Sequence, residues 1–375
     1  MYQILELNQI DELEEFRLPW RLLHSKTRRG SLFQTLDWLQ LYWETFGAEQ
    51  KLRVFLVYRG TEITGIMPLV VRREPTKLGS VRVLTYPLQD WGSFFGPIGP
   101  SPASTLYEVF RFLRDADRDW DVIEPRWIDK EVVDFGRTAA AMREADFRPV
   151  ESVWKEIALI EFGVSWDEYW AARSSKFREN IRRAEKKIEA GYAPEFIRYR
   201  PHGEIAGDDD PRWDLFDQVV DVAGRGWQGD STDGTTLCHV SVAPFFRAVH
   251  ELAARLGMLD LTLLRLKDRP VAFMYNYHHA GYVNGIRMGF DAEMKELGIG
   301  RHIQYLSFKD AAERGDHTID LGPDYFDAKK PWMTRVAASH RCSHYTMLSP
   351  KAQLLAWKRW WSERHSEGKA KAVSG

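Results

Sequence analysis

The sequence contains few cysteines, no long apolar run and almost no excess charge. Among its 375 residues only Cys238 and Cys342 are cysteines, too few for a disulfide framework, and free thiols are typical of the reducing cytosol. No stretch reaches the roughly 18 consecutive apolar residues that a membrane-spanning helix needs, and the N-terminal residues lack the features of a secretory signal. We therefore expect a soluble, cytoplasmic protein.

The charge balance also excludes a class of partner. The formal net charge of -2 provides no general attraction to nucleic acid, so we expect no DNA partner, and any polyanion site must be a local patch. Hydrophobic residues make up 44% of the chain and charged residues 28%, a balance typical of a globular enzyme.

Helix and strand patterns alternate along the chain, which predicts a mixed α/β (α+β) fold. Each half contains a helix, a hairpin with a tight connection, a loop and another helix. We therefore predict two tandem units, each a mostly antiparallel mixed sheet flanked by helices, over residues 1–150 and 151–349, followed by a tail over residues 350–375.

The most informative segment is a glycine-containing loop between a predicted strand over 281–290 and a predicted helix over 299–314. Glycines allow the backbone to approach a ligand closely. Free N–H groups at a helix start, together with the helix dipole, favour an anion such as a diphosphate. A packing role for the two glycines remains the alternative. The predicted donor-binding residues are Lys295, Leu297, Gly298, Ile299, Gly300 and Arg301.

Short motifs in a fixed order resemble the CelD/BcsL-type acetyltransferases of the GNAT superfamily, which have two tandem GNAT-like units and an architecture related to the Fem aminoacyl ligases. Three positions depart from that pattern: Gly226, Gln228, and Ala328 where a tyrosine is usual. The motifs that carry the resemblance are Phe33-Gln-Thr-Leu-Asp-Trp-Leu, Gly65-Ile-Met-Pro-Leu, Ser175-Lys-Phe-Arg-Glu-Asn-Ile-Arg-Arg-Ala, Pro270-Val-Ala-Phe, Leu297-Gly-Ile-Gly and Asp320-Leu-Gly.

The resemblance implies an acyltransferase with an acyl-CoA donor, acetyl-CoA first, bound in the second unit. It implies a small or saccharide-linked acceptor and a role in exopolysaccharide or cellulose biosynthesis. Two alternatives remain open: a Fem-type ligase that uses aminoacyl-tRNA, and a non-catalytic scaffold of a polysaccharide synthase, which Ala328 favours.

The candidate catalytic residues follow the last predicted core strand, where the cleft of such a fold should open. Asp320 is a candidate base or a turn-capping carboxylate, Tyr325 a candidate acid or a cover of the cleft, and Lys329 a candidate ligand for phosphate or acceptor. Trp227 and Trp332 are candidate stacking residues for substrate, with packing as the alternative.

Three further features have both a functional and a structural interpretation. The basic helix over 174–190 is either a solvated face or a polyanion groove that would suit tRNA. The histidines at 278–279 and around Cys342 do not complete a metal site, so we predict no metal. The tail interleaves tryptophans with lysines and arginines, and it either packs on the domain or contacts a membrane surface or a synthase.

Overall fold

The computed structural model describes residues 1–77, 79–229, 231 and 236–373, with side chains up to residue 362. It confirms the predicted mixed α/β fold, and most of the strand pairs are antiparallel. The strands are β1 (Tyr2–Leu7), β2 (Gln50–Arg59), β3 (Glu62–Thr76), β4 (Gly79–Thr85), β5 (Val122–Ile123), β6 (Ile128–Asp129), β7 (Val150–Glu161), β8 (Pro194–Tyr199), β9 (Leu259–Leu266), β10 (Arg269–His279), β11 (Tyr282–Phe290), β12 (Thr318–Asp320) and β13 (Arg335–Tyr345).

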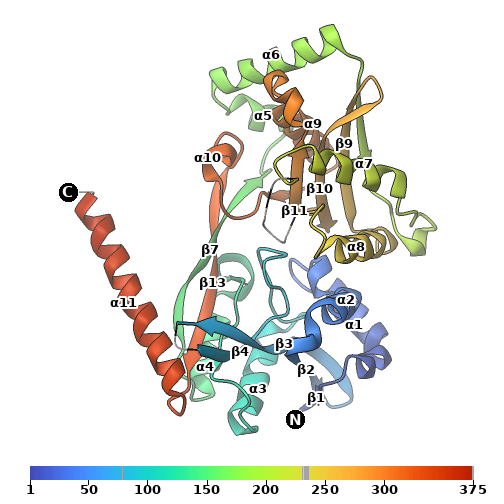
Figure 1. The fold of residues 1–375 in the computed structure, drawn as a ribbon. Coiled ribbons are helices and arrows are strands. Elements are labelled where there is room, and N and C mark those ends of the chain that lie inside the picture. The colour runs from blue at the N-terminus through green and yellow to red at the C-terminus, as the bar shows by residue number, and fades with distance from the viewer. Residues whose placement is uncertain (78, 230, 232–235, 374–375) are drawn as a thin grey trace.

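Helices cover both faces of the sheet (Figure 1). They are α1 (Arg17–Ser25), α2 (Leu36–Phe46), α3 (Pro102–Asp115), α4 (Arg137–Glu144), α5 (Trp166–Ala171), α6 (Ser175–Gly191), α7 (Trp213–Gly224), α8 (Ala243–Arg255), α9 (Ile299–Glu313), α10 (Phe326–Lys329) and α11 (Pro350–Val373). Short helical turns are η1 (Asp11–Phe16), η2 (Leu32–Gln34), η3 (Gly47–Glu49), η4 (Lys130–Asp134), η5 (Glu204–Ala206) and η6 (Ala292–Leu297). No helix in the described part of the chain combines the length and apolar character needed to cross a bilayer.

Local sequence signals account for most of these elements. The Thr35 hydroxyl accepts a hydrogen bond from the Trp38 amide at 3.1 Å and so caps the start of α2. The Ser174 hydroxyl caps α6 in the same way, at 3.3 Å from the Phe177 amide. Gly60, with φ of 65°, makes the tight connection of the predicted hairpin of β2 and β3.

The strand order shows the tandem repeat and also an exchange of strands that the local patterns do not predict. One half of the sheet runs β1-β2-β3-β4-β5-β13 and the other β8-β9-β10-β11-β12-β7, and the two halves join where β13 pairs with β7. In each half the fourth and fifth strands, β4 with β5 and β11 with β12, are parallel neighbours. The two halves therefore exchange their sixth strands, because β7 follows the first half in sequence and pairs in the second, while β13 does the reverse.

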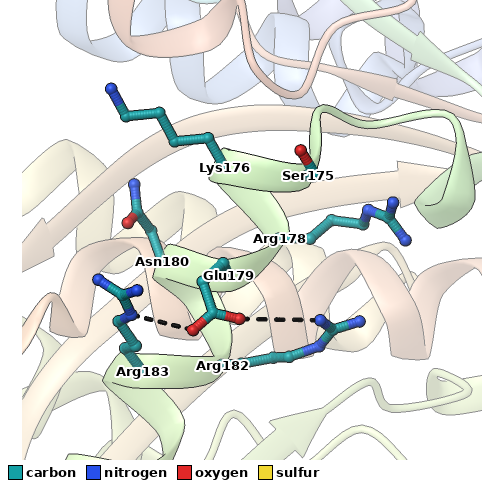
Figure 2. A pocket seen from close by; sticks show the side chains of 7 residues that line it. All are labelled: Ser175, Lys176, Arg178, Glu179, Asn180, Arg182 and Arg183. Carbon is teal, nitrogen blue, oxygen red and sulfur yellow. Dashed lines mark hydrogen bonds and ion pairs between the residues drawn. The ribbon is translucent and has the colours of Figure 1, made fainter.

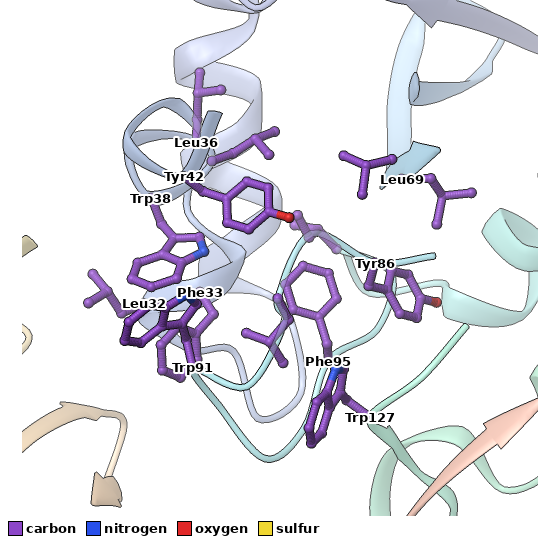
Figure 3. Packing of buried hydrophobic residues seen from close by; sticks show 14 of the residues in the cluster. Leu32, Phe33, Leu36, Trp38, Tyr42, Leu69, Tyr86, Trp91, Phe95 and Trp127 are labelled. Atoms are coloured by element: carbon purple, nitrogen blue, oxygen red, sulfur yellow. The ribbon is translucent and has the colours of Figure 1, made fainter. Parts of the chain in front are cut away.

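Aromatic side chains form a core that continues from one half into the other. Figure 3 shows residues of this core that belong to the first half, among them Phe33, Trp38 and Trp91. The Phe33 ring contacts Tyr277 edge-on, with 6.0 Å between centroids. The ring of Phe245 on α8 packs against Trp38 at 5.5 Å and Trp91 at 5.0 Å. Because these rings come from both halves and are largely removed from water, the halves are expected to unfold together.

Candidate functional site

The second half of the sheet contains two parallel strands that separate. β11 and β12 pair at only three positions, from Tyr282 with Thr318 to Asn284 with Asp320, after which β12 ends and β11 continues to Phe290. A Cβ atom at Gly285 would lie 2.6 Å from the carbonyl oxygen of Asp320. Only glycine permits this close approach at the point of separation.

β11 is also bent at this point. Tyr275 of β10 lies opposite Arg287, and the next residue, Asn276, lies opposite Gly285, so Ile286 is an extra residue in β11. Such a bulge leaves one residue out of the ladder and redirects the backbone, and bulges are frequent beside active sites. Backbone groups beyond Ile286 are therefore the candidates for polarising a carbonyl bound between the separated strands.

The predicted glycine loop lies after β11 and offers two free amides. Gly298 has φ of 73°, and its own N–H donates to the Lys295 carbonyl at 3.0 Å. The Ile299 and Gly300 N–H groups, at the first turn of α9, donate to no acceptor among the described residues, whereas the next amide, Arg301, donates to the Gly298 carbonyl at 3.1 Å. Two amides and the positive end of the α9 dipole therefore meet at one place, an arrangement suited to a phosphate group.

Both glycines of the loop are in close contact with neighbouring side chains. A Cβ atom at Gly300 would lie 2.7 Å from the Phe290 ring, and one at Gly298 would lie 3.2 Å from the Ala184 methyl group on α6. The two glycines therefore have a packing role, and the same loop also offers two free amides. Of the other predicted donor-binding residues, Lys295 and Arg301 are exposed and Leu297 is half-buried, while the Ile299 side chain is fully buried, so only its backbone is available.

Helix α6, which packs beside this loop, carries a cationic surface (Figure 2). Lys176 and Arg183 lie on one side of the helix, and Arg178 and Arg182 lie on the other. Glu179 pairs with Arg183 at 2.9 Å and with Arg182 at 3.9 Å. A shallow pocket on this surface is lined by four cationic side chains and one carboxylate, which leaves an excess of positive charge close to the glycine loop.

Asp320 and Lys329 lie together at the turn after β12. The Asp320 carboxylate is 2% exposed and accepts hydrogen bonds from the Gly322 amide at 2.7 Å and the Tyr282 hydroxyl at 3.2 Å. The Ser93 hydroxyl, from the first half of the chain, also bonds it, and burial raises the pKa of Asp320. The turn-capping role considered from the sequence is therefore present, and it does not conflict with a role in proton transfer.

The Lys329 ammonium group closes the same turn. Its Nζ atom donates to the carbonyl oxygens of Gly322 at 3.0 Å and Pro323 at 2.6 Å. Burial lowers the pKa of Lys329 to about 8, so its charge changes just above neutral pH. Tyr325, by contrast, is 81% exposed at the start of α10, and its hydroxyl forms no hydrogen bond with the described residues of this turn.

The two candidate tryptophans differ in position. Trp227 is half exposed and lies beside the end of β11, because a Cβ atom on its neighbour Gly226 would lie 2.7 Å from the Phe290 carbonyl oxygen. Trp332 is 1% exposed; its indole N–H donates to Gln304 at 3.0 Å, and aromatic rings surround it. The backbone next to Trp227 therefore lies beside the end of β11, whereas Trp332 is part of the core.

Two residues at this edge of β11 were not predicted as site residues. Gln228 is buried, and its amide donates to the Met288 carbonyl at 3.2 Å while its carbonyl accepts from the Leu237 amide. Arg225 forms an ion pair with Asp291, which follows β11. The contacts with Met288 and Asp291 join residues 60 and 66 positions apart, so spacing in the sequence gives no signal for them.

Comparisons with known proteins agree with this geometry. Residues 175–330 match the family model of an acetyltransferase (GNAT) domain. The chain is similar to the crystal structure of FemX, with a TM-score of 0.58 and 15% identity over 93% of this chain and 99% of that one. It is also similar to a conserved protein of unknown function from Bacteroides thetaiotaomicron VPI-5482, with a TM-score of 0.52 and 13% identity over 92% and 100% of the chains. No curated protein matches the sequence.

These findings support part of the predicted assignment. Residues 175–330 are therefore similar to a GNAT acetyltransferase domain, and most of the chain has a fold similar to that of FemX. At these identities the solved structures establish the fold alone.

Proposed function

We propose that the protein transfers an acyl group from an acyl-CoA, acetyl-CoA first, to an amine or hydroxyl of a small or saccharide-linked acceptor in exopolysaccharide biosynthesis. The observation that carries the proposal is the pair of free amides at Ile299 and Gly300, placed directly after a strand that separates from its parallel neighbour. The amides suit the diphosphate of CoA, and its extended arm would lie where β11 separates from β12. The family match over residues 175–330 supports this donor.

Chain residues can be assigned to the reaction as follows. The acceptor nitrogen or oxygen attacks the thioester carbonyl and loses its proton to solvent, the carbon–sulfur bond breaks, and the thiolate takes up a proton from a residue that solvent then reprotonates. Lys329, with a pKa of about 8, is the proposed proton donor, and Asp320 beside it holds the turn. Holding donor and acceptor together supplies much of the rate acceleration, on the order of 7–11 kcal/mol at best. Trp227 is the proposed contact of the acceptor.

Calorimetric titration of the full chain with CoA tests the donor. We expect one CoA bound per chain, and slow release of free thiol from acetyl-CoA in a colorimetric assay without acceptor. Dephospho-CoA, which keeps the diphosphate, should still bind, whereas pantetheine, which lacks it, should bind at least about tenfold more weakly because the amide contacts are lost. Absence of CoA binding, or equal binding of pantetheine, would contradict the proposal.

Replacement of Lys329 by methionine tests the assigned proton donor. A general acid contributes typically 10²–10⁴-fold, so we expect kcat to fall by about a hundredfold while the CoA affinity stays unchanged. Since Lys329 is a donor only when protonated, wild-type kcat should decrease as the pH rises through about 8, and the variant should lose this decrease. Lys330→Met, at an exposed neighbour, is the matched control. An unaltered pH profile in Lys329→Met would exclude the assignment.

A second donor, aminoacyl-tRNA, is favoured by the cationic surface of α6 (Figure 2). It predicts that tRNA co-purifies with the chain, that its affinity falls steeply with salt, and that charge reversal at Arg178 and Arg182 abolishes the interaction. If the chain binds CoA and does not bind tRNA, the result favours acyl-CoA over aminoacyl-tRNA as the donor.

A further inference from the structure

One face of α11 fastens the start of this helix to the sheet. Ala352 is fully buried among valines of β4 and β5, and Leu355 packs beside it. The Arg359 guanidinium forms an ion pair with the buried Glu124 and donates to the Tyr345 hydroxyl at 2.9 Å. These three positions, 352, 355 and 359, lie on one side of the helix because their spacing follows its period. The helix therefore has a fixed rotation about its axis up to at least Arg359.

The opposite side of α11 carries large apolar side chains in solvent. Leu354, Trp357 and Trp361 follow the helical spacing i, i+3, i+7 and are 47%, 61% and 51% exposed. Trp360, 47% exposed, lies next to them, and the rings of Trp357 and Trp361 are 5.8 Å apart. Figure 1 shows the helix running away from the sheet toward the C-terminus. Leu354, Trp357 and Trp361 therefore lie opposite the anchored side of α11, with Trp360 at their border, and these four exposed side chains are here called the tryptophan face.

An apolar face of this kind has a cost in water, which indicates that something covers it. Its composition identifies the kind of surface. Tryptophan prefers the boundary between lipid headgroups and hydrocarbon, where an apolar ring and a polar N–H are both accommodated. A leucine and three tryptophans exposed along two helical turns therefore suit the interfacial boundary of a membrane.

The positive charge of the C-terminal segment indicates the type of membrane. Residues 350–375 contain six lysines or arginines and two glutamates. Because Arg359 is paired with Glu124, an excess of three positive charges remains in a chain whose total is -2. Lys351 and Lys358 border the tryptophan face on the exposed side of α11. Anionic headgroups attract such basic segments. A second copy of the chain would instead place two positive tails against each other, which is unfavourable.

We propose that the tryptophan face of α11 binds the surface of a bilayer that contains anionic lipid, and so holds the enzyme beside a membrane. The fixed ion pair of Arg359 with Glu124 presents the face in one orientation relative to the sheet. Binding of this kind is peripheral and reversible. It places the site on β11 near acceptors that are carried by lipid or assembled at the membrane, although the lipid contact itself does not depend on the acyl-transfer reaction.

Flotation of the full chain with vesicles tests the proposal. We expect the wild-type chain to float with phosphatidylcholine vesicles that contain phosphatidylglycerol, with a blue shift of tryptophan emission, and to bind pure phosphatidylcholine weakly. The triple variant Trp357→Ser, Trp360→Ser, Trp361→Ser should lose at least about tenfold in partitioning. Ile205→Ser, at a side chain that is 94% exposed on η5, removes apolar surface elsewhere and should bind as the wild type does.

A second pair of substitutions separates charge from apolar contact. Lys351→Glu with Lys358→Glu should weaken binding to anionic vesicles and leave binding to neutral vesicles unchanged. All variants should bind CoA as the wild type does, so failure of this proposal is distinct from failure of the proposed reaction. The proposal would be overturned if the triple variant floats like the wild type, if no vesicle binds, or if the wild type dimerises in solution and only the triple variant is monomeric.

Discussion

Replacement of Gly300 by glutamate is expected to lower the affinity for CoA by at least about a hundredfold, roughly 2.7 kcal/mol. The new carboxylate would start from the first turn of α9, beside the free amides of Ile299 and Gly300, and would compete with and repel the diphosphate. Its Cβ atom would lie 2.7 Å from the Phe290 ring, so the ring must also move. Calorimetric titration of both proteins with CoA measures the change.

Two controls make this result interpretable. Gly191→Glu adds the same charge at the end of α6, where a Cβ atom meets nothing within 4 Å, and it should leave CoA affinity within a factor of about two. Arg301→Ala, at an exposed side chain next to the amides, should weaken CoA by several fold without changing the thermal midpoint. If Gly300→Glu is folded and binds CoA normally, the diphosphate does not bind at this loop.

Asp260→Asn is expected to lower the free energy of unfolding by about 3–5 kcal/mol, because it breaks a buried ion-pair network. The Asp260 carboxylate is fully buried and accepts two hydrogen bonds from Arg198, both at 2.8 Å, and it pairs with Arg200 at 3.3 Å. Asn276 donates to it at 3.1 Å. Loss of the Asp260 charge leaves the largely buried guanidinium groups of Arg198 and Arg200 without a full counter-charge. Urea denaturation measures the resulting decrease in the free energy of unfolding.

An exposed pair provides the comparison. Asp217→Asn removes the partner of Arg247, where both side chains are at least half exposed, and it should cost less than about 1 kcal/mol. If Asp260→Asn also lowers the free energy of unfolding by less than about 1 kcal/mol, the buried network does not stabilise the fold.

The same network predicts sensitivity to acid. Burial alone would raise the pKa of Asp260, but the charges of Arg198 and Arg200 outweigh it and hold this pKa at about 2. A carboxylate whose folded pKa lies below its unfolded value of about 3.9 contributes stability that is present above pH 4 and is lost as the pH falls toward 2. The wild type should therefore lose more stability than Asp260→Asn between pH 5 and pH 3.

The predicted elements that proved correct depend on neighbours in the sequence. The Thr35 cap of α2 and the Ser174 cap of α6 are contacts between residues three apart. The turn at Gly60 depends on the conformation of one residue. The strand, glycine loop and helix over residues 282–313 follow one another directly, so their amides converge by local geometry alone.

Local sequence patterns do not predict the strands that the two halves exchange. The sequence of β13, from Arg335 to Tyr345, alternates small, basic and polar residues with few β-branched side chains, and it carries little strand signal. It becomes a strand because β5, β6 and β7 supply its hydrogen-bond partners. The position of Trp332 is decided in the same way, since α6 and α9 close over a residue that the sequence places in a polar segment.

Short segments of the sequence predict the α/β class, the tandem order of elements and the position of the glycine loop, because helix caps, tight turns and strand periodicity depend on neighbouring residues. Tertiary packing, by contrast, sets the hydrogen bond from Ser93 to Asp320, the position of Gln228 beside β11 and the exposure of the tryptophan face. These contacts join residues far apart in the chain, and their partners are fixed by how the two halves pack, which no local pattern encodes.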